Sequence, residues 1–251
     1  MLLSWENIVL VIVVGILTGF INTLSGSGSL ISLPILMFIG LPPHVANGTN
    51  RIGILFQNLV SAGNYYRKGM LDVRMGLELA LPSILGSIAG AYIVSGISPR
   101  AVEISVAVVL LVMLIPLWLK PRQWLEGKDM SEVGHSPSLR FLVFFLVGMY
   151  GGYIQAGVGI FLLSALVLNA GYDLVRANAL KVFINLIFTP FALGVFLWMG
   201  HVNWGVGLVL AIGNAIGAWF ASQWSVAWGP SFVRYVLVAV IVGSGVKLLF
   251  F

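Results

Sequence analysis

The chain has no cysteine and few charged residues, and these two absences exclude several classes of protein. Among its 251 residues are only 13 lysines and arginines and 8 aspartates and glutamates. Without cysteine, the chain cannot have disulfides, thiolate nucleophiles, cysteine-ligated clusters or Cys-type zinc sites. Charged residues make up 8% and hydrophobic residues 59%, with a mean hydropathy of +1.04, whereas soluble domains carry about 25% charged residues. The composition predicts an all-α integral membrane protein, so we expect the lipid bilayer to be one of its partners.

Other absences bear on function. The sequence has no GxxxxGK[ST] loop for ATP, which favours secondary transport. The net charge of +5 does not indicate nucleic acid, because the basic residues lie mostly in loops between apolar segments, as membrane orientation requires. The first apolar run is longer than that of a signal peptide, so we expect it to stay in the mature protein. We expect no enzyme activity, no catalytic or metal site and no cofactor.

Long apolar segments predict about eight full transmembrane helices, since a spanning helix needs about 20 residues. They lie at about 8–24, 45–64, 75–96, 101–119, 139–155, 177–198, 204–227 and 232–250. Two shorter segments, at about 30–40 and 160–170, follow glycine-rich breaks. As helices these would rise only about 16 Å, roughly half of a 30 Å hydrocarbon core, so we interpret them as half-helices.

The two halves of the chain match at a constant offset of 131 residues. The matches run without gaps over about 80 residues and include Gly26 with Gly157, Gly40 with Gly171, Asn47 with Asn178 and Gly69 with Gly200. Such self-similarity is typical of an internal duplication. It predicts a first transmembrane repeat at 1–119, a linker at 120–138 and a second transmembrane repeat at 139–251.

The loops indicate how the repeats are oriented. Residues 64–74 contain three lysines and arginines, whereas the matching residues 195–205 contain none. Under a positive-inside bias this contrast favours inverted repeats, which place the two loops on opposite sides of the membrane. We therefore expect a multi-pass protein of the inner or plasma membrane with the central linker in the cytoplasm. Parallel repeats remain the alternative.

The polar residues within the apolar segments predict a substrate site at the bilayer midplane. A half-helix N-terminus offers free N–H groups and a partial positive charge, which suit an anion. Arg51 and Lys181 each lie about seven residues into a helix, and the few acids available to neutralise them all lie at segment ends or in loops. Snorkelling and helix packing are the alternative roles. The expected substrate-binding residues are Ser27, Gly28, Ser29, Asn47, Thr49, Asn50, Arg51, Gln155, Gly157, Gly159, Asn178, Lys181 and Asn185.

Two histidines lie at predicted turns. Either His44 or His201 could titrate near neutral pH and couple protons to transport. A structural role at the membrane boundary is the alternative.

Two long stretches carry a family resemblance. GFINTLSGSGSLISLPILMFIGLPPHVANGTNRIG, from Gly19, and GGYIQAGVGIFLLSALVLNAGYDLVRANALKVFINL, from Gly151, resemble the sulfite exporter TauE/SafE family of membrane permeases. The resemblance covers almost the whole chain. It implies transport of small anions, often sulfur-containing ones such as sulfite or organosulfonates like sulfoacetate. A homodimer is compatible with this assignment.

The function expected is therefore export of a small sulfur-containing anion by alternating access. A permease or channel for another small anion is the alternative. An intramembrane serine hydrolase would need a base beside Ser27 or Ser29, and His201 lies in a predicted surface loop. A scaffold protein without its own pathway would not need two deep cations.

Overall fold

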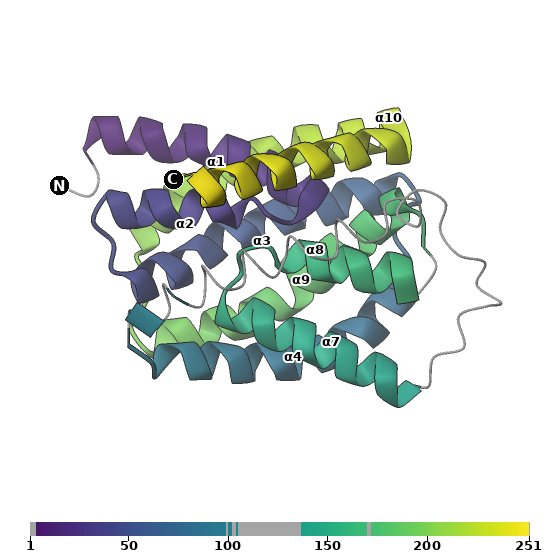
Figure 1. Ribbon diagram of the computed structural model, residues 1–251, viewed down its shortest axis with the longest axis horizontal. Helices are drawn as coiled ribbons and strands as arrows, with labels where there is room; N and C mark the ends of the chain where they lie inside the picture. Colours follow the sequence, from purple (N-terminus) through teal and green to yellow (C-terminus); the bar gives the residue numbers. More distant parts are fainter. Residues whose placement is uncertain (1–3, 99, 102–103, 105–136, 170–171, 251) are drawn as a thin grey trace.

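The computed structural model describes residues 4–98, 100–101, 104, 137–169 and 172–250, and every element in these ranges is helical (Figure 1). In chain order the helices are α1 Trp5–Ser25, α2 Ser29–Phe38, α3 Pro43–Arg67, α4 Val73–Ser95, α7 Pro137–Tyr153, α8 Val158–Ser164, the π-helix η2 Ala165–Asn169, α9 Leu174–Trp198 and α10 Trp204–Phe250. The predicted all-helical class is confirmed for the described residues. Nearly all of the predicted segment 101–119 and most of the linker 120–138 lie outside them.

Four of these helices are long and apolar enough to cross a membrane: Trp5–Ser25, Val73–Ser95, Leu174–Trp198 and Trp204–Trp228. α3 has 25 residues but is more polar, because it contains several amide and hydroxyl side chains. These side chains are buried inside the bundle. α7 has only 17 residues. The predicted segments 204–227 and 232–250 both fall within α10, which Figure 1 shows doubling back toward its yellow C-terminal end.

Both predicted half-helices are present, but the second is irregular. α2 is a ten-residue α-helix, whereas the second is seven α-helical residues of α8 followed by five π-helical residues of η2. A π-turn inserts one residue per turn into the hydrogen-bond ladder, so it cannot be recognised from apolar periodicity. Each half-helix follows a glycine with positive φ, Gly26 at 78° and Gly157 at 75°. L side chains rarely adopt this conformation, so glycine is required at both breaks.

Contacts between helices fix their relative directions. Gly15 and Gly19 of α1 lie against Leu210 and Asn214 of α10, so these two helices run the same way. Gly148 and Gly152 of α7 lie against Ser83 and Ser87 of α4, so α4 and α7 also run in the same direction as each other.

α3 also runs in the direction of α10. The Thr49 hydroxyl accepts a hydrogen bond from the Asn203 N–H, and the Asn64 amide donates to the Ser222 hydroxyl. α9 runs against α3, because Phe196 near its end lies against Gly48 near the start of α3. α4 runs with α9, because Gly76 lies against Phe183 and Ser87 donates to the Phe188 carbonyl. Helices α1, α3 and the first part of α10 therefore run one way, and α4, α7 and α9 run the other.

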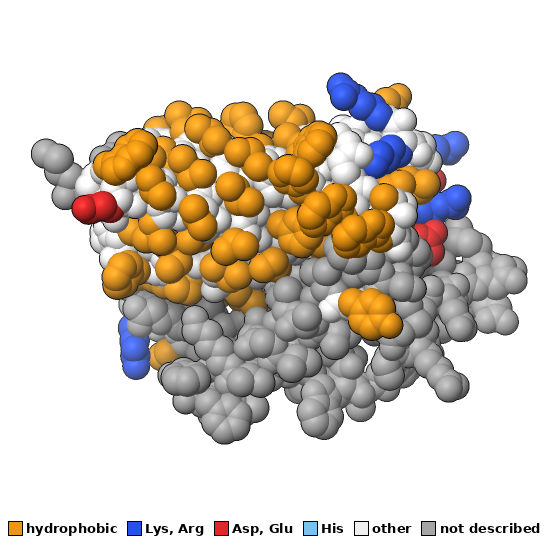
Figure 2. All heavy atoms as spheres, turned by 90° about the horizontal axis from the view of Figure 1, so that it is seen from above, with side chains coloured by type: hydrophobic (Ala, Val, Ile, Leu, Met, Phe, Trp, Pro, Cys, Tyr) orange, Lys and Arg blue, Asp and Glu red, His pale blue; other side chains and the backbone are white. Residues whose placement is uncertain are grey.

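These directions gather basic residues at one end of the molecule. We call it the basic end: α3 finishes there with Arg67, and α4, α7 and α9 begin there with Arg74, Arg140 and Arg176. Figure 2 shows blue side chains gathered at one end of an apolar surface. Arg100, which follows α4, lies at the opposite end.

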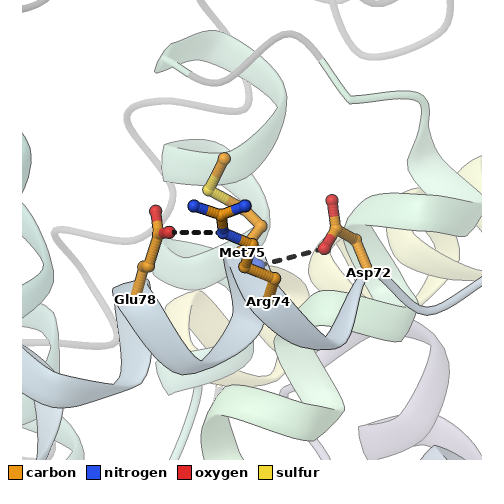
Figure 3. A network of polar contacts seen from close by, with 4 residues as sticks. All are labelled: Asp72, Arg74, Met75 and Glu78. Atoms are coloured by element: carbon orange, nitrogen blue, oxygen red, sulfur yellow. Dashed lines mark hydrogen bonds and ion pairs between the residues drawn. The ribbon is translucent and has the colours of Figure 1, made fainter.

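The start of α4 illustrates the surface chemistry of the basic end (Figure 3). Asp72 caps the helix by accepting a hydrogen bond from the Met75 N–H at 3.0 Å, and Arg74 lies 3.4 Å from Glu78. The side chains of Arg74 and Glu78 are 92% and 55% exposed. Exposed ion pairs contribute little stability, so this pair does not hold the fold together.

Candidate functional site

The two glycine breaks lie in direct backbone contact at the centre of the bundle. The Gly159 N–H donates to the Gly26 carbonyl at 3.3 Å. A Cβ added to Gly26 would lie 2.1 Å from the Gly159 Cα, and one added to Gly159 would lie 2.2 Å from the Gly26 Cα. Only two glycines permit this approach. The breaks, far apart in the sequence, thus form one structural unit.

Arg51 of α3 closes the end of α7, a helix of the other half. Its guanidinium donates to the carbonyls of Gly151 at 3.0 Å and Gly152 at 2.5 Å, and to Oε1 of Gln155 at 3.0 Å. The Phe196 ring lies 4.6 Å from the guanidinium carbon, in cation–π geometry. A helix C-terminus carries about half a negative charge, so it favours a cation.

Lys181 of α9 closes the end of α1 in the same way. Its Nζ donates to the carbonyls of Asn22 at 3.1 Å and Thr23 at 2.7 Å, in the last turn of α1. Arg51 and Lys181 are 0% and 1% exposed. No ion pair joins either cation to a carboxylate among the residues that the structure describes. We call these two sets of contacts the helix-end clamps.

Neutral side chains connect the clamps to the breaks. Gln155, which accepts from Arg51, also donates to the Asn185 amide oxygen at 2.7 Å. On the other break, the Asn50 amide donates to Ser29 at 3.0 Å and accepts from Ser32 at 2.7 Å, which fixes the start of α2. The Ser27 hydroxyl lies 2.6 Å from that of Ser25. The first turn of α2 is therefore held by side chains of its own half.

Several backbone donors at the second break are occupied. The N–H groups of Val158 and Ile160 donate to the carbonyls of Gln155 and Gly157, at 3.3 and 3.0 Å. Together with the Gly159 N–H, which is taken by Gly26, these bonds account for the first donors of α8. An anion here must displace them.

Not every expected site residue lies at the breaks. The Thr49 hydroxyl faces the loop between α9 and α10. Asn178 lies beside Tyr65, whose hydroxyl lies 2.6 Å from the Ser225 hydroxyl. Asn47 donates to the Tyr153 carbonyl at 2.8 Å. Hydrogen bonds join Arg51, Gln155 and Asn185 into one group. The point where the breaks meet is surrounded by Lys181, Gly157 and Gly159. Gly28 is the N-cap residue of α2.

Buried polar atoms without hydrogen bonds mark the same helices. Within the described part of the chain they include Asn47 Oδ1, Asn178 Oδ1 and Nδ2, Asn58 Nδ2 and Thr189 Oγ1. Asn47 matches Asn178, and Asn58 matches Thr189, at the offset of 131 residues. Burying an unpaired polar group is costly, and native structures satisfy nearly all of them. Their recurrence at matched positions of α3 and α9 shows hydrogen-bonding groups that the described protein atoms leave unused.

Sequence reasoning missed part of this arrangement. The carbonyls of Asn22, Thr23, Gly151 and Gly152 are backbone groups and have no signature in the sequence. Asn214 of α10 could have been recognised from the sequence, because it is an amide within an apolar segment. It is fully buried, and both of its polar atoms lack partners among the described residues. The described residues contain no group of three or more His, Asp or Glu that could hold a metal ion.

The comparison with family models matches residues 11–248 to the model described as Sulfite exporter TauE/SafE. The chain belongs to the sulfite exporter TauE/SafE family. This agrees with the resemblance read from the glycine-rich breaks, and it makes the protein a membrane transporter of the TauE/SafE family.

Curated relatives of this TauE/SafE protein are transporters by name. "Probable membrane transporter protein ORF9" of Sinorhizobium sp is 28% identical over 98% of this chain and 94% of its own length. A "Probable membrane transporter protein" of Haemophilus influenzae is 26% identical over 90% of this chain and 88% of its own. "Probable membrane transporter protein YfcA" of Escherichia coli K12 is 25% identical, covering 94% and 87%. No solved structure matches the chain.

Proposed function

We propose that this transporter exports a small sulfur oxyanion, such as sulfite or an organosulfonate like sulfoacetate, through a site beside the touching glycine breaks. The observation that carries the proposal is the pair of fully buried cations, Arg51 and Lys181, held by neutral carbonyls and amides. Carbonyls and amides compensate each positive charge only in part, so the region favours an anion. Sulfonate and sulfite oxygens accept hydrogen bonds from guanidinium, ammonium and amide groups alike.

We infer that the anion binds by exchange. Each clamp offers its cation to helix-end carbonyls, and an oxyanion is a stronger acceptor than a carbonyl. Binding at Arg51 would free the carbonyls of Gly151 and Gly152, and the end of α7 could then move. Binding at Lys181 would free the end of α1 in the same manner. Alternating access would follow from exchanging the clamps in turn.

Inverted repeats are the arrangement we favour for this mechanism. Three observations support them: α1 runs opposite to α7, α3 opposite to α9, and α4 opposite to the first part of α10. The positive-φ glycines recur at the predicted offset, Gly26 with Gly157 and Gly69 with Gly200. In transporters built this way the substrate binds near the bilayer midplane, at the interface of the repeats.

We also propose that the basic end faces the cytoplasm of a cell with this protein in its inner or plasma membrane. Lysines and arginines are enriched in cytoplasmic loops, and more of the described surface arginines lie at that end than at the other. The linker 120–138 would then be cytoplasmic.

The proposal is tested by thermal unfolding of the purified protein in detergent with sulfite, thiosulfate, sulfoacetate, taurine, isethionate, sulfate, lactate and chloride. A ligand at 100 times its Kd stabilises by about 2.7 kcal/mol, which for a domain of this size raises Tm by about 5–10 °C. We expect such a shift with one or two sulfur oxyanions. A shift with lactate or chloride alone would move the substrate to another class of anion.

Arg51→Lys is the informative variant, since it keeps the charge but loses the planar fork whose two terminal nitrogens reach separate acceptors. We expect it to weaken the anion-induced shift by at least tenfold in apparent Kd. Arg67→Lys, on the same helix at the basic end, should leave the shift unchanged. If a well-folded Arg51→Lys binds the anion as the natural protein does, Arg51 is not part of the site.

A further inference from the structure

Two histidines from distant parts of the chain stack on each other at the end of the molecule opposite the basic end. The rings of His44, in the first turn of α3, and His201, in the loop between α9 and α10, have centroids 5.3 Å apart and planes 19° apart. Both residues are half-buried, yet Nδ1 of each ring is buried and has no partner among the described residues. An unpaired ring nitrogen is a place where a proton can bind.

The surroundings of the pair are mainly apolar. Val45 of α3 and Val202 of the loop belong to the neighbouring clusters, with Phe196 of α9 and Val206 of α10. Two charged groups, Glu6 and Arg100, lie at the same end of the described chain, and neither contributes to the shift at His201. Arg51 lies beyond the Phe196 ring. Burial, and then the neighbouring His44, lowers the pKa of His201 below its ordinary value of 6.5.

The stacked rings sit on a loop that contacts the α3 backbone closely. A Cβ added to Gly48 would lie 2.0 Å from the His201 carbonyl oxygen and 3.0 Å from the Phe196 ring. The Asn203 N–H donates to Thr49 at 2.9 Å, and the His201 N–H donates to the Phe196 carbonyl at 2.8 Å. Phe196 in turn lies under the guanidinium of Arg51. A displacement of this loop therefore changes the surroundings of a helix-end clamp.

We propose that His44 and His201 form a proton-binding site that keeps the loop 199–203 against α3 while the rings are neutral and releases it when both are protonated. Neutral imidazoles stack favourably, whereas two imidazolium ions at this distance repel each other. The proton comes from water and adds to a ring nitrogen lone pair, so no other reactant is needed. This inference goes beyond the proposed function and does not depend on which anion is carried.

The test is hydrogen exchange of the purified full-length protein at pH 8.0, 6.5 and 5.0, corrected for the intrinsic pH dependence of exchange. We expect the protection of residues 199–203 to fall by about tenfold or more between pH 8.0 and 5.0. In His44→Gln no second positive charge can form and only the burial of His201 remains, so protection should fall clearly less. His135→Gln removes the third histidine of the chain and should behave as the natural protein does.

The pH dependence of Tm is a second test, which keeps the proposal falsifiable if one variant does not fold. Because the pKa of His201 is lowered in the folded protein, its stabilising contribution is present above pH 6.5 and is lost as the pH falls through the lowered value. Tm should therefore fall with acidification in the natural protein more than in His44→Gln or His201→Gln. Equal pH dependence of loop protection in the natural protein and in both variants would overturn the proposal.

Discussion

At the scale of single residues, the buried cations are held by backbone rather than by acids. Arg51 and Lys181 each bind two carbonyls of a helix end, and the last turn of a helix presents several carbonyls that have no partner within the helix. Such an arrangement holds a cation in place without neutralising its full charge. A carboxylate would form a tighter pair and would compete with any anionic ligand. Neutral acceptors therefore suit a binding cation better than an ion pair does.

Gly26 and Gly159 give the sharpest residue-scale prediction. We expect Gly26→Ala or Gly159→Ala to destabilise the protein by about 3 kcal/mol or more, because the new methyl group would overlap the other break and the backbone has little room to shift. At Gly26 the positive φ adds strain. Expression level and Tm in detergent measure the effect.

Gly63→Ala and Gly194→Ala are the matched controls. They occupy matching positions in α3 and α9, and an added Cβ would meet no atom within 4 Å. Alanine favours a helix over glycine by about 0.5–1 kcal/mol, so both controls should be neutral or slightly stabilising. A tolerated Gly159→Ala would mean that the breaks do not touch.

At the scale of elements, the half-helix α2 returns the chain so that α3 can run beside α1 in the same direction. The Thr23 and Ser61 hydroxyls lie 3.1 Å apart, and the Asn22 amide donates to Gln57. Since the chain has no cysteine, a disulfide can form only between two introduced cysteines, and its formation measures how close the two positions lie.

We predict that the double variant Thr23→Cys with Ser61→Cys forms a disulfide under mild oxidation, because the two side-chain oxygens are already in contact. Mass spectrometry of the linked peptides measures it. Thr23→Cys with Thr49→Cys should remain unlinked, as Thr49 lies near the other end of α3. A disulfide in the second pair but not in the first would show that α3 runs opposite to α1.

The elements were predictable from the sequence to different degrees. Apolar runs bounded by glycine and proline predict the helices from Trp5 to Ser95, and half-length runs predict α2 and the segment that follows Gly157. The partners of Arg51 and Lys181 were not predictable, because backbone carbonyls are the same at every position. The π-helical turns of η2 leave the apolar composition unchanged and so escape notice as well.

At the scale of the whole molecule, the uneven distribution of basic residues predicts the orientation in the membrane. Arg74 lies at the basic end with an exposed side chain, and Arg100 lies at the opposite end. We expect a membrane-impermeant thiol reagent added to intact cells to label Arg100→Cys and not Arg74→Cys. Labelling of both after the membrane is opened is the control. Labelling of Arg74→Cys alone in intact cells would invert the orientation.

The crossed helix-end clamps also impose an order on biosynthesis. Lys181 enters the membrane when its acceptors in α1, 158 and 159 residues earlier, are already in place. Arg51 is made 100 residues before the carbonyl of Gly151 exists. At about 5–20 residues per second, that interval lasts about 5–20 s. During this time the nascent first half holds an arginine without its acceptors, so the ribosome must deliver the second half before the first can settle in the bilayer.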